Sequence, residues 1–279
     1  MTTPTPLDAG QLRSRLVDSG PYEALDVVTV TGSTNSDLLE AAGRGAADRT
    51  VLLAEEQRAG RGRSQRSWVS PRGYGLHVSV LLRPSEVPAS AIGWLPLICG
   101  VALADAVAAT GLRAALKWPN DLLLADDRGE WAKAAGILAD GLAGDSGMSA
   151  VLGIGVNVLH GPQQLPTTSS GLPATSLAAR GAEVDRAEFA VDLLARLAEI
   201  DRTWRAHGGD VLASGLLDRY HRWCGTLGQQ VRVDLGRDEP LRGTATDLDG
   251  TGRLVVRGAD GAATAVSAGD VVHLRRSEE

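Results

Sequence analysis

The sequence predicts an α+β protein with two parts, a large domain over residues 1–224 and a small all-β domain over residues 225–279. In the larger part, helix-like apolar segments are interleaved with short runs rich in valine, leucine and threonine. From Gly225 onward, short alternating runs are separated by turn sequences such as "GRDEP" and "DGTG", which predict about five strands and a small β-barrel. With 279 residues, 43% of them hydrophobic, the chain has enough apolar material for a sizeable core.

Strands and helices alternate from the N-terminus. The runs "ALDVVTV", "TVLLAEE" and "GLHVSVLLR" predict three strands. Thr34 has the position of a helix N-cap, because Asp37 follows three residues later as in a capping box, and Gly43 or Gly45 ends that helix. The predicted elements are a helix over 7–19, a strand over 24–30, a helix from 34 to 43 or 45, and strands over 50–56 and 75–83.

The middle of the chain continues this alternation. Pro96 either interrupts a long apolar helix or marks its true start. The segment "KWPND" predicts a hairpin turn with Lys117 and Asp121 near its tip, because proline and asparagine are turn formers. The predicted elements are a helix over 89–110, strands over 114–118, 121–126, 133–140 and 149–159, a turn over 141–148, a loop over 160–174, and helices over roughly 185–206 and 209–223.

Composition excludes several classes of protein. The net charge of −6 and a pI near 5.4 argue against non-specific binding to nucleic acid, which depends on many basic contacts to phosphates. Cys99 and Cys224 alone give neither a disulfide framework nor a metal site. The N-terminus does not resemble a signal peptide, and Gly or Pro interrupts every long apolar stretch. We therefore expect a cytoplasmic protein without a membrane partner.

The use of lysine is unusual. The chain has 28 lysine and arginine residues, and only Lys117 and Lys133 are lysines. Lysine is a compact point charge and arginine a broad planar fork, so these positions indicate sites where arginine does not fit. Two alternatives stay open: the lysines occur by chance, or Lys133 protects an edge strand. The hypothesis of greater interest is a lysine in a cleft that contacts an anionic ligand.

Residues 55–68, "EEQRAGRGRSQRSW", concentrate arginine and glycine in one short loop. A flexible surface turn is one interpretation. However, Gly60 and Gly62 allow close approach of the backbone to a ligand, and Arg61 and Arg63 carry planar donors suited to carboxylate or phosphate oxygens. Trp68 adds a flat apolar face beside these charges. The pattern is too short and too little repeated for an RNA-binding arginine–glycine tail, which favours a pocket for a negatively charged molecule.

Common catalytic motifs are absent from the sequence. There is no G-x-x-x-x-G-K-[ST] loop and no G-x-S-x-G elbow. The segment "GIGVNV" at 153–158 begins like a dinucleotide fingerprint but has no third glycine and lies within a strand-like run. The histidines have no ligand spacing, so we expect no dedicated metal site. Any nucleotide must be held by another arrangement.

Taken together, five motifs resemble those of biotin–protein ligases. They are "STN" at 33–35, "GRGR" at 60–63, "KWPND" at 117–121, "KAAGIL" at 133–138 and "GIGVNV" at 153–158. Each motif is weak alone, but five in this order are specific, and the similarity covers about residues 25 to 275. The resemblance implies a mixed sheet flanked by helices, of the class II aminoacyl-tRNA synthetase type, followed by an SH3-like barrel.

The resemblance also implies an activity. Enzymes of this family make biotinyl-5′-AMP from biotin and ATP with Mg²⁺, and then transfer biotin to a lysine of a biotin carboxyl carrier protein domain of an acyl-CoA carboxylase. No prosthetic group and no covalent enzyme intermediate are needed, so catalysis consists of positioning and charge stabilisation. The arginine–glycine loop would be the lid over biotin and the adenylate.

Site residues follow from the motifs. The catalytic residues implied are Lys133, Arg63 and Lys117. The biotin-binding residues implied are Ser33, Thr34, Asn35, Gln57, Arg61, Gly62, Arg63 and Lys133. The ATP-binding residues implied are Gly60, Arg61, Arg63, Trp68, Lys117, Asn120, Asp121 and Asn157. The sequence departs from the family at Gln65, where a basic residue is common, which puts details of the lid in doubt.

Two other functions are alternatives to biotin ligation. A lipoate–protein ligase shares the fold but is expected to carry an "RRxSGGG"-like motif, which this sequence lacks. A nucleic-acid-binding regulator would use the basic loop. Some biotin ligases carry an N-terminal winged helix–turn–helix, but only about two dozen residues precede the first predicted strand here. We therefore expect no binding to DNA.

Overall fold

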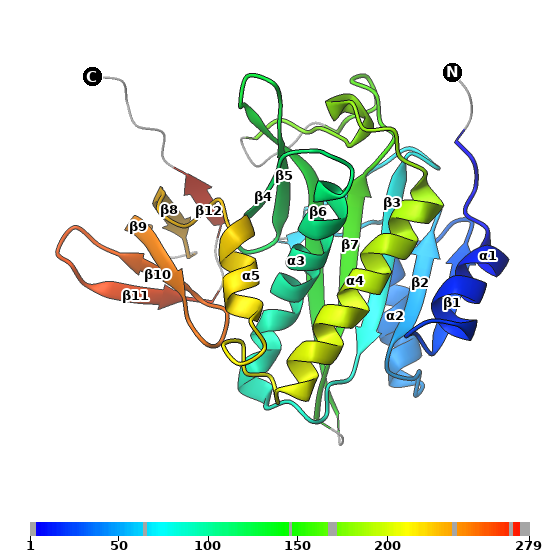
Figure 1. Ribbon diagram of the computed structural model, residues 1–279, viewed down its shortest axis with the longest axis horizontal. Coiled ribbons are helices and arrows are strands. Elements are labelled where there is room, and N and C mark those ends of the chain that lie inside the picture. Colours follow the sequence, from blue (N-terminus) through cyan, green and yellow to red (C-terminus); the bar gives the residue numbers. More distant parts are fainter. Residues whose placement is uncertain are drawn as a thin grey trace.

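The larger part of the protein is built on a seven-stranded mixed sheet. The computed structural model describes residues 4–63, 66–144, 147–166, 172–235, 239–267 and 270–273. The strands are β1 (Ala24–Val28), β2 (Thr50–Ala54), β3 (Gly75–Leu82), β4 (Ala114–Lys117), β5 (Asp121–Ala125), β6 (Trp131–Gly144) and β7 (Gly147–Asn157). Their order is β1-β2-β3-β7-β6-β5-β4 (Figure 1). β1 and β2 are parallel, and the other neighbours are antiparallel.

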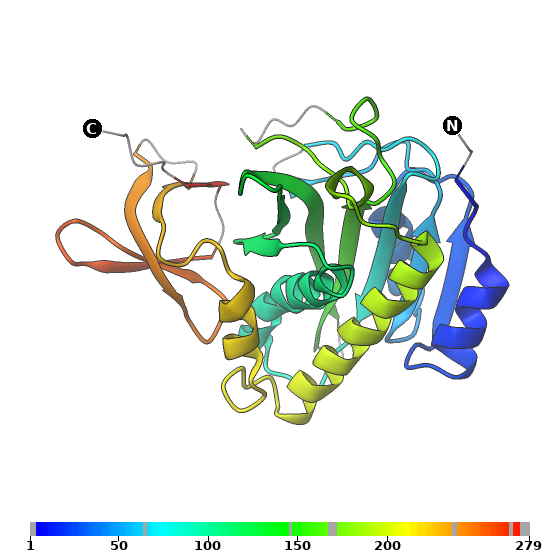
Figure 2. The same ribbon diagram turned by 45° about the horizontal axis from the view of Figure 1, so that its top comes forward.

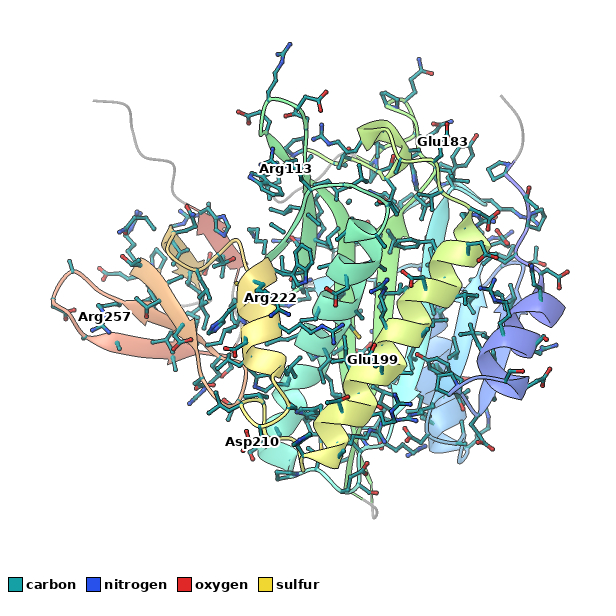
Figure 3. The ribbon with its side chains drawn as sticks, in the orientation of Figure 1. Arg113, Glu183, Glu199, Asp210, Arg222 and Arg257 are labelled. Carbon is teal, nitrogen blue, oxygen red and sulfur yellow. The ribbon has the colours of Figure 1, made fainter. Side chains whose placement is uncertain are left out.

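Helices cover both faces of this sheet. They are α1 (Ala9–Arg13), continued by a π-helical turn over Ser14–Asp18, α2 (Thr34–Gly43), α3 (Leu95–Ala108), α4 (Arg186–Ala206) and α5 (Leu216–Trp223), with 3₁₀ turns at Ala89–Trp94 and Ala178–Arg180. Helices α3 and α4 pack on one face and α2 on the other (Figure 1). Side chains fill the space between α3, α4 and the sheet (Figure 3). All eight residues of β3 are buried, as expected for a strand with both faces covered.

The long apolar helix starts at Leu95, and the Pro96 alternative is settled in favour of a true helix start. Proline fits the first turn of a helix, because the backbone N–H groups there have no hydrogen-bond partner within the helix and the N–H that proline lacks is not needed. By length and composition, the helical stretch Ala89–Ala108 passes the test for a membrane span. Most of this apolar stretch is buried inside the protein, where α3 packs against α4 and the sheet. This helix is therefore the central core helix.

Three expectations about element ends were wrong. The N-cap of α2 is Ser33 rather than Thr34: Ser33 is extended, and its hydroxyl accepts a hydrogen bond from the Ser36 N–H. The segment 141–148 is strand as far as Gly144 and again from Gly147, because the β6–β7 ladder continues through it despite turn-forming residues. Helix α5 begins at Leu216 rather than near 209, because Gly215 in the left-handed region separates it from the turns before it.

The C-terminal part is a five-stranded antiparallel sheet. Its strands are β8 (Gln230–Asp234), β9 (Leu241–Leu248), β10 (Leu254–Arg257), β11 (Ala263–Val266) and β12 (Asp270–His273). They pair in the order β11-β10-β9-β8-β12, beside α5 and to the left of the main sheet in Figure 2. Among the described residues the edge strands β11 and β12 do not pair with each other. We expected a closed barrel. The strand pairing among the described residues instead gives an open sheet.

A buried ion pair connects four distant segments of the larger part. Arg186 at the start of α4 and Glu55 after β2 lie 2.8 Å apart, and their side chains are 3% and 7% exposed. Arg186 also donates to the carbonyls of Gly75 and Thr5, and Glu55 accepts the N–H of Leu7. The pair therefore fastens the N-terminal segment and α4 to the end of the sheet nearest the arginine–glycine loop.

We expect Arg186→Met to lower the free energy of unfolding by about 3 to 5 kcal/mol, because it leaves a buried carboxylate without its cation. The control is Arg13→Met, which breaks the half-exposed pair of Arg13 and Asp26 and should cost at most about 1 kcal/mol. Urea unfolding of both variants measures the difference. Equal losses would show that the buried pair contributes no more than the surface pair.

Candidate active site

The five motifs meet in one cavity of about 370 Å³. Its walls are the arginine–glycine loop, the N-terminal end of α2, strands β6 and β7, the β4–β5 hairpin and part of the C-terminal sheet. The structure brings the following sequence-predicted residues to its surface: Ser33, Thr34, Asn35, Gln57, Arg61, Gly62, Arg63, Trp68, Lys117, Asn120, Asp121, Lys133 and Asn157. Gly60 does not line the cavity. A Cβ there would lie 2.4 Å from the Trp68 carbonyl oxygen, so its glycine serves the fold of the loop.

One end of the cavity is a closed network of uncharged polar groups. The Gln57 amide oxygen accepts hydrogen bonds from the Thr34 N–H (2.8 Å) and the Thr34 hydroxyl (3.0 Å). Beneath them, the hydroxyl of Ser79 on β3 lies 2.7 Å from the Thr34 hydroxyl and 2.6 Å from the Asn35 amide oxygen. Ser79 is fully buried and was missed by the sequence analysis. Such a network fixes hydroxyl and amide groups in place for a polar ring.

Asn35 has a further partner. Its amide nitrogen donates to a carboxylate oxygen of Asp140 on β6 at 3.0 Å, and the Arg61 guanidinium donates to the same oxygen at 3.0 Å. Asp140 does not line the cavity. It lies behind two residues that do, Asn35 and Arg61, and no local pattern in the sequence indicates it.

The cavity floor is a strip of sheet without side chains. Gly136 on β6 and Gly155 on β7 are paired across the two strands. A Cβ at Gly155 would lie 2.6 Å from the Trp68 indole, and one at Gly136 would lie 3.3 Å from it. At Gly153 a Cβ would lie 2.2 Å from the Asn35 amide oxygen. The glycines of "KAAGIL" and "GIGVNV" therefore give flat contact area to Trp68 and Asn35.

Lys133 lies in the cavity wall and not at a sheet edge. Strand β6 runs between β5 and β7, so the edge-strand alternative is wrong. The Lys133 ammonium forms a 2.6 Å ion pair with Asp121 and lies 6.0 Å from the centre of the Trp68 ring. Backbone hydrogen bonds join Lys133 to Pro173 and Thr175. The backbone hydrogen bonds fix the main chain of Lys133, and the ion pair with Asp121 fixes its ammonium group. The lysine lies among the residues predicted to bind biotin and those predicted to bind the nucleotide.

The amides of the predicted nucleotide side are oriented by backbone groups. Asn120 donates to the Ile137 carbonyl at 3.0 Å and accepts from Arg63 at 3.2 Å. Asn157 donates to the Thr175 carbonyl at 3.0 Å. Within the described residues, the Asn157 amide oxygen and the Trp68 indole N–H are buried without a hydrogen-bond partner. Both residues line the cavity, but these two atoms themselves are covered by protein.

His77 on β3 is a second residue that the sequence analysis missed. Burial lowers the pKa of His77, so the imidazole is neutral. Its Nδ1 lies 3.3 Å from the Ala54 carbonyl oxygen and must carry the hydrogen, which leaves Nε2 as a hydrogen-bond acceptor. Nε2 has no partner among the described residues, and His77 lines the cavity. The signal for both missed residues was present: His77 and Ser79 are polar residues at spacing two in an otherwise apolar strand.

The cavity is positively charged although the chain is acidic. Among the described residues that line it, six carry positive charge and two carry negative charge. The cations are Arg61, Arg63, Arg66, Lys117, Lys133 and Arg232, and the acids are Asp121 and Asp234. Arg232 and Asp234 come from β8, a contribution of the C-terminal sheet that the sequence analysis did not foresee. Clustered like charges in a cleft attract an anionic ligand. In the described part of the chain no group of three or more His, Cys, Asp and Glu side chains could hold a metal ion.

Comparisons with known protein families agree with the resemblance of the five motifs that line this cavity. The profile of the biotin/lipoate A/B protein ligase family matches residues 27–157, and that of the biotin protein ligase C-terminal domain matches residues 226–274. The chain is 40% identical over 276 residues to a biotin–[acetyl-CoA-carboxylase] ligase of Mycobacterium tuberculosis, covering 97% of each protein. It is 32% identical to the bifunctional ligase/repressor BirA of Salmonella typhimurium, covering 90% of this chain and 73% of that relative.

Solved structures give the same result for the fold. The chain superposes on the biotin protein ligase of Aquifex aeolicus in complex with biotin and ATP with a TM-score of 0.72 at 25% identity. The match covers 91% of this chain and 100% of the other. The mixed sheet flanked by helices that we expected from the sequence is therefore confirmed, as is a separate C-terminal β-structure, which is an antiparallel sheet and not the closed barrel that we expected.

We expect Gly155→Ala to displace the Trp68 indole, because the new methyl group would lie 2.6 Å from it, while the fold is retained. NMR of the tryptophan side-chain N–H groups should show the Trp68 resonance shifted. Gly43→Ala is the control, since nothing lies within 4 Å of a Cβ at that position. An unchanged Trp68 resonance in Gly155→Ala would contradict the packing of the indole on the glycine floor.

Proposed function

The chain belongs to the biotin/lipoate A/B protein ligase family, and we propose that it acts there as a biotin–protein ligase. It activates biotin with ATP to biotinyl-5′-AMP and transfers biotin to a lysine of a carrier protein. The observation that carries this proposal is the meeting of all five motifs in one cationic cavity. The cavity has an uncharged polar end suited to a ureido ring and a charged centre suited to a carboxylate and phosphates.

The first step needs charge stabilisation more than acid–base chemistry. A carboxylate oxygen of biotin attacks the α-phosphorus of ATP, the bond to the β-phosphate oxygen breaks, and pyrophosphate leaves. Two anions must approach each other, so cations have to lie where they meet. We assign this role to Lys133, Arg63 and Lys117. Lys133 is already desolvated and fixed by Asp121, which suits it to contact an oxygen that gains charge in the transition state.

The two ends of the cavity would divide the substrates. On the biotin side we place the Thr34–Gln57–Ser79 network with Asn35 and Arg61, because donors and acceptors alternate there. The nucleotide side holds the remaining predicted residues, Gly60, Trp68, Asn120, Asp121 and Asn157. Mg²⁺ would enter as the counter-ion of ATP rather than at a site of the protein's own.

In the second step a lysine amine of the acceptor attacks the acyl carbonyl of the adenylate, an amide forms, and AMP leaves. We propose that the acceptor is the biotin carboxyl carrier protein domain of an acyl-CoA carboxylase, and that the reaction takes place in the cytoplasm. The M. tuberculosis relative is named for acetyl-CoA carboxylase. A lipoate ligase activity is not favoured, since both this relative and the superposed A. aeolicus protein are named as biotin ligases.

The function is tested by isotope exchange between pyrophosphate and ATP. Exchange should depend on biotin and should not be supported by lipoate or octanoate. Wild-type protein that exchanges equally with lipoate, or not at all with biotin, would refute the assignment.

We expect Lys133→Arg to lose most of the exchange activity while the melting temperature stays near that of the wild type. Arginine keeps the charge, but its planar fork is too broad for the position between Asp121 and the Trp68 ring. Loss of one such transition-state contact costs about 2 to 4 kcal/mol, or roughly thirty- to a thousandfold in rate. Near-wild-type exchange would remove Lys133 from the catalytic residues.

A measurement of DNA binding distinguishes the ligase from the alternative function, that of a nucleic-acid-binding regulator. The overall charge of −6 should repel a polyanion, and we expect the cationic cavity to serve the small-molecule substrates. Fluorescence anisotropy with random duplex at physiological salt should show no saturable binding below about 1 μM, the tight end of non-specific affinity. Sequence-selective binding at nanomolar concentrations would require a second function.

A further inference from the structure

Asp140 is a charged residue near the cavity for which the mechanism above has no role. It lies on β6 seven positions after Lys133, and its side chain is 26% exposed. One of its carboxylate oxygens accepts from Asn35 at the N-terminal end of α2 and from Arg61 in the arginine–glycine loop, each at 3.0 Å. A single atom therefore joins two elements that are far apart in the sequence and that both line the cavity.

The Asn35 side of this junction is rigid. The Asn35 amide oxygen lies 2.6 Å from the Ser79 hydroxyl, and its nitrogen also lies 3.3 Å from the Leu138 carbonyl oxygen. The missing side chain of Gly153 leaves room for the amide. Each polar atom of the Asn35 side chain thus has a partner, and the partners come from two strands, β3 and β6. Asp140 is consequently anchored to a fixed group on one side.

The Arg61 side is the one that Asp140 positions. Arg61 is 46% exposed and lies in a short loop that is closed by two backbone hydrogen bonds, Gly62 N–H to the Arg66 carbonyl and Trp68 N–H to the Gly60 carbonyl. A partly exposed Arg–Asp pair contributes little to folding stability. Stability is therefore not its main effect. What the pair changes is the direction of a long cationic side chain that otherwise has many rotamers.

We infer that Asp140 is a positioning residue, which holds the Arg61 guanidinium beside Asn35 at the biotin side of the cavity. It acts through these two residues, because it does not itself reach the cavity. Its effect should fall mainly on biotin binding, because Asn35 belongs to the biotin side alone, whereas Asn120 and Asn157 of the nucleotide side are held by other groups. The inference rests on the proposed function for the identity of the ligand, but not for the geometry.

The kinetic test uses biotin-dependent pyrophosphate exchange. Asp140→Asn should raise the KM for biotin about tenfold, within the usual range of coupling between residues in one network, with a smaller change in the KM for ATP and an unchanged melting temperature. Asp140→Glu should recover most of the biotin affinity. Asp26→Asn is the matched control, because Asp26 pairs with Arg13 at 2.7 Å on β1 of the same sheet, outside the cavity. An Asp140→Asn enzyme with the wild-type KM for biotin would overturn the inference.

A double-mutant cycle separates positioning from an independent contribution. Arg61→Gln and Asp140→Asn should each raise the KM for biotin, and the double variant should be little worse than Arg61→Gln alone. Effects that multiply would show that Asp140 does not act through Arg61.

Amide hydrogen exchange keeps this inference separate from the proposed function. In protein without substrates, Asp140→Asn should speed exchange at Gly62 and Trp68, whose N–H groups close the loop, and leave β6 and β7 unchanged. Faster exchange together with an inactive wild type would retain the positioning role and refute biotin as the ligand. Unchanged exchange together with an active wild type would retain the ligase and refute the role of Asp140.

Discussion

The absence of side chains on one strip of the sheet is the constraint on which the site depends. Gly136, Gly153 and Gly155 lie on adjacent strands. The groups above Gly153 and Gly155 approach to distances that no Cβ would permit, and a Cβ at Gly136 would make a tight contact of 3.3 Å with Trp68. Because the floor is flat backbone, Trp68 packs directly on the sheet and Asn35 reaches its partners on the neighbouring strands. The position of the arginine–glycine loop, which carries Trp68, follows from this close approach. A sheet with ordinary side chains there would fill the cavity.

Charge is the second constraint, and it is handled by pairing. A desolvated ion costs several kcal/mol unless an opposite charge and hydrogen bonds compensate it. Lys133 and Asp121, which are 19% and 9% exposed, satisfy this condition for each other across β5 and β6. An anionic substrate that replaces or joins Asp121 as the partner of Lys133 meets a cation that folding has already largely removed from water. Binding therefore adds little further desolvation cost for Lys133. The paired cation is thus prepared for a ligand, while the excess of positive charge in the cavity attracts it.

The sequence alone predicted most elements and the membership of the site, because local patterns encode both. Alternation and apolar runs located the strands, and the ordered short motifs together with the arginine–glycine loop located thirteen cavity residues. It could not predict partnerships between distant strands. Nothing near Asp140 indicates Arg61, which lies 79 positions away, and the pairing follows only from the order of the sheet. Ser79 and His77 were detectable, since buried polar residues in a strand covered on both faces require partners. The N-cap of α2 was misplaced by one residue because Ser33 and Thr34 both suit that position.

The C-terminal sheet shows why the second part of the chain matters to the first. The Trp118 N–H donates to the Thr226 hydroxyl at 3.0 Å, and the Trp118 indole donates to the Gly252 carbonyl at 3.2 Å. These bonds hold the turn that follows Lys117 against the second sheet. His273 on β12 lies 3.0 Å from the same hydroxyl of Thr226, and its pKa is lowered to about 4, first by burial and then by the charge of Lys117. Neutral His273 therefore adds no competing charge beside Lys117. The second sheet thus helps to fix one of the cations to which we assign a role in the reaction, and the β8 side chains Arg232 and Asp234 add to the cavity wall. This makes the site a product of both sheets, although every motif lies in the first.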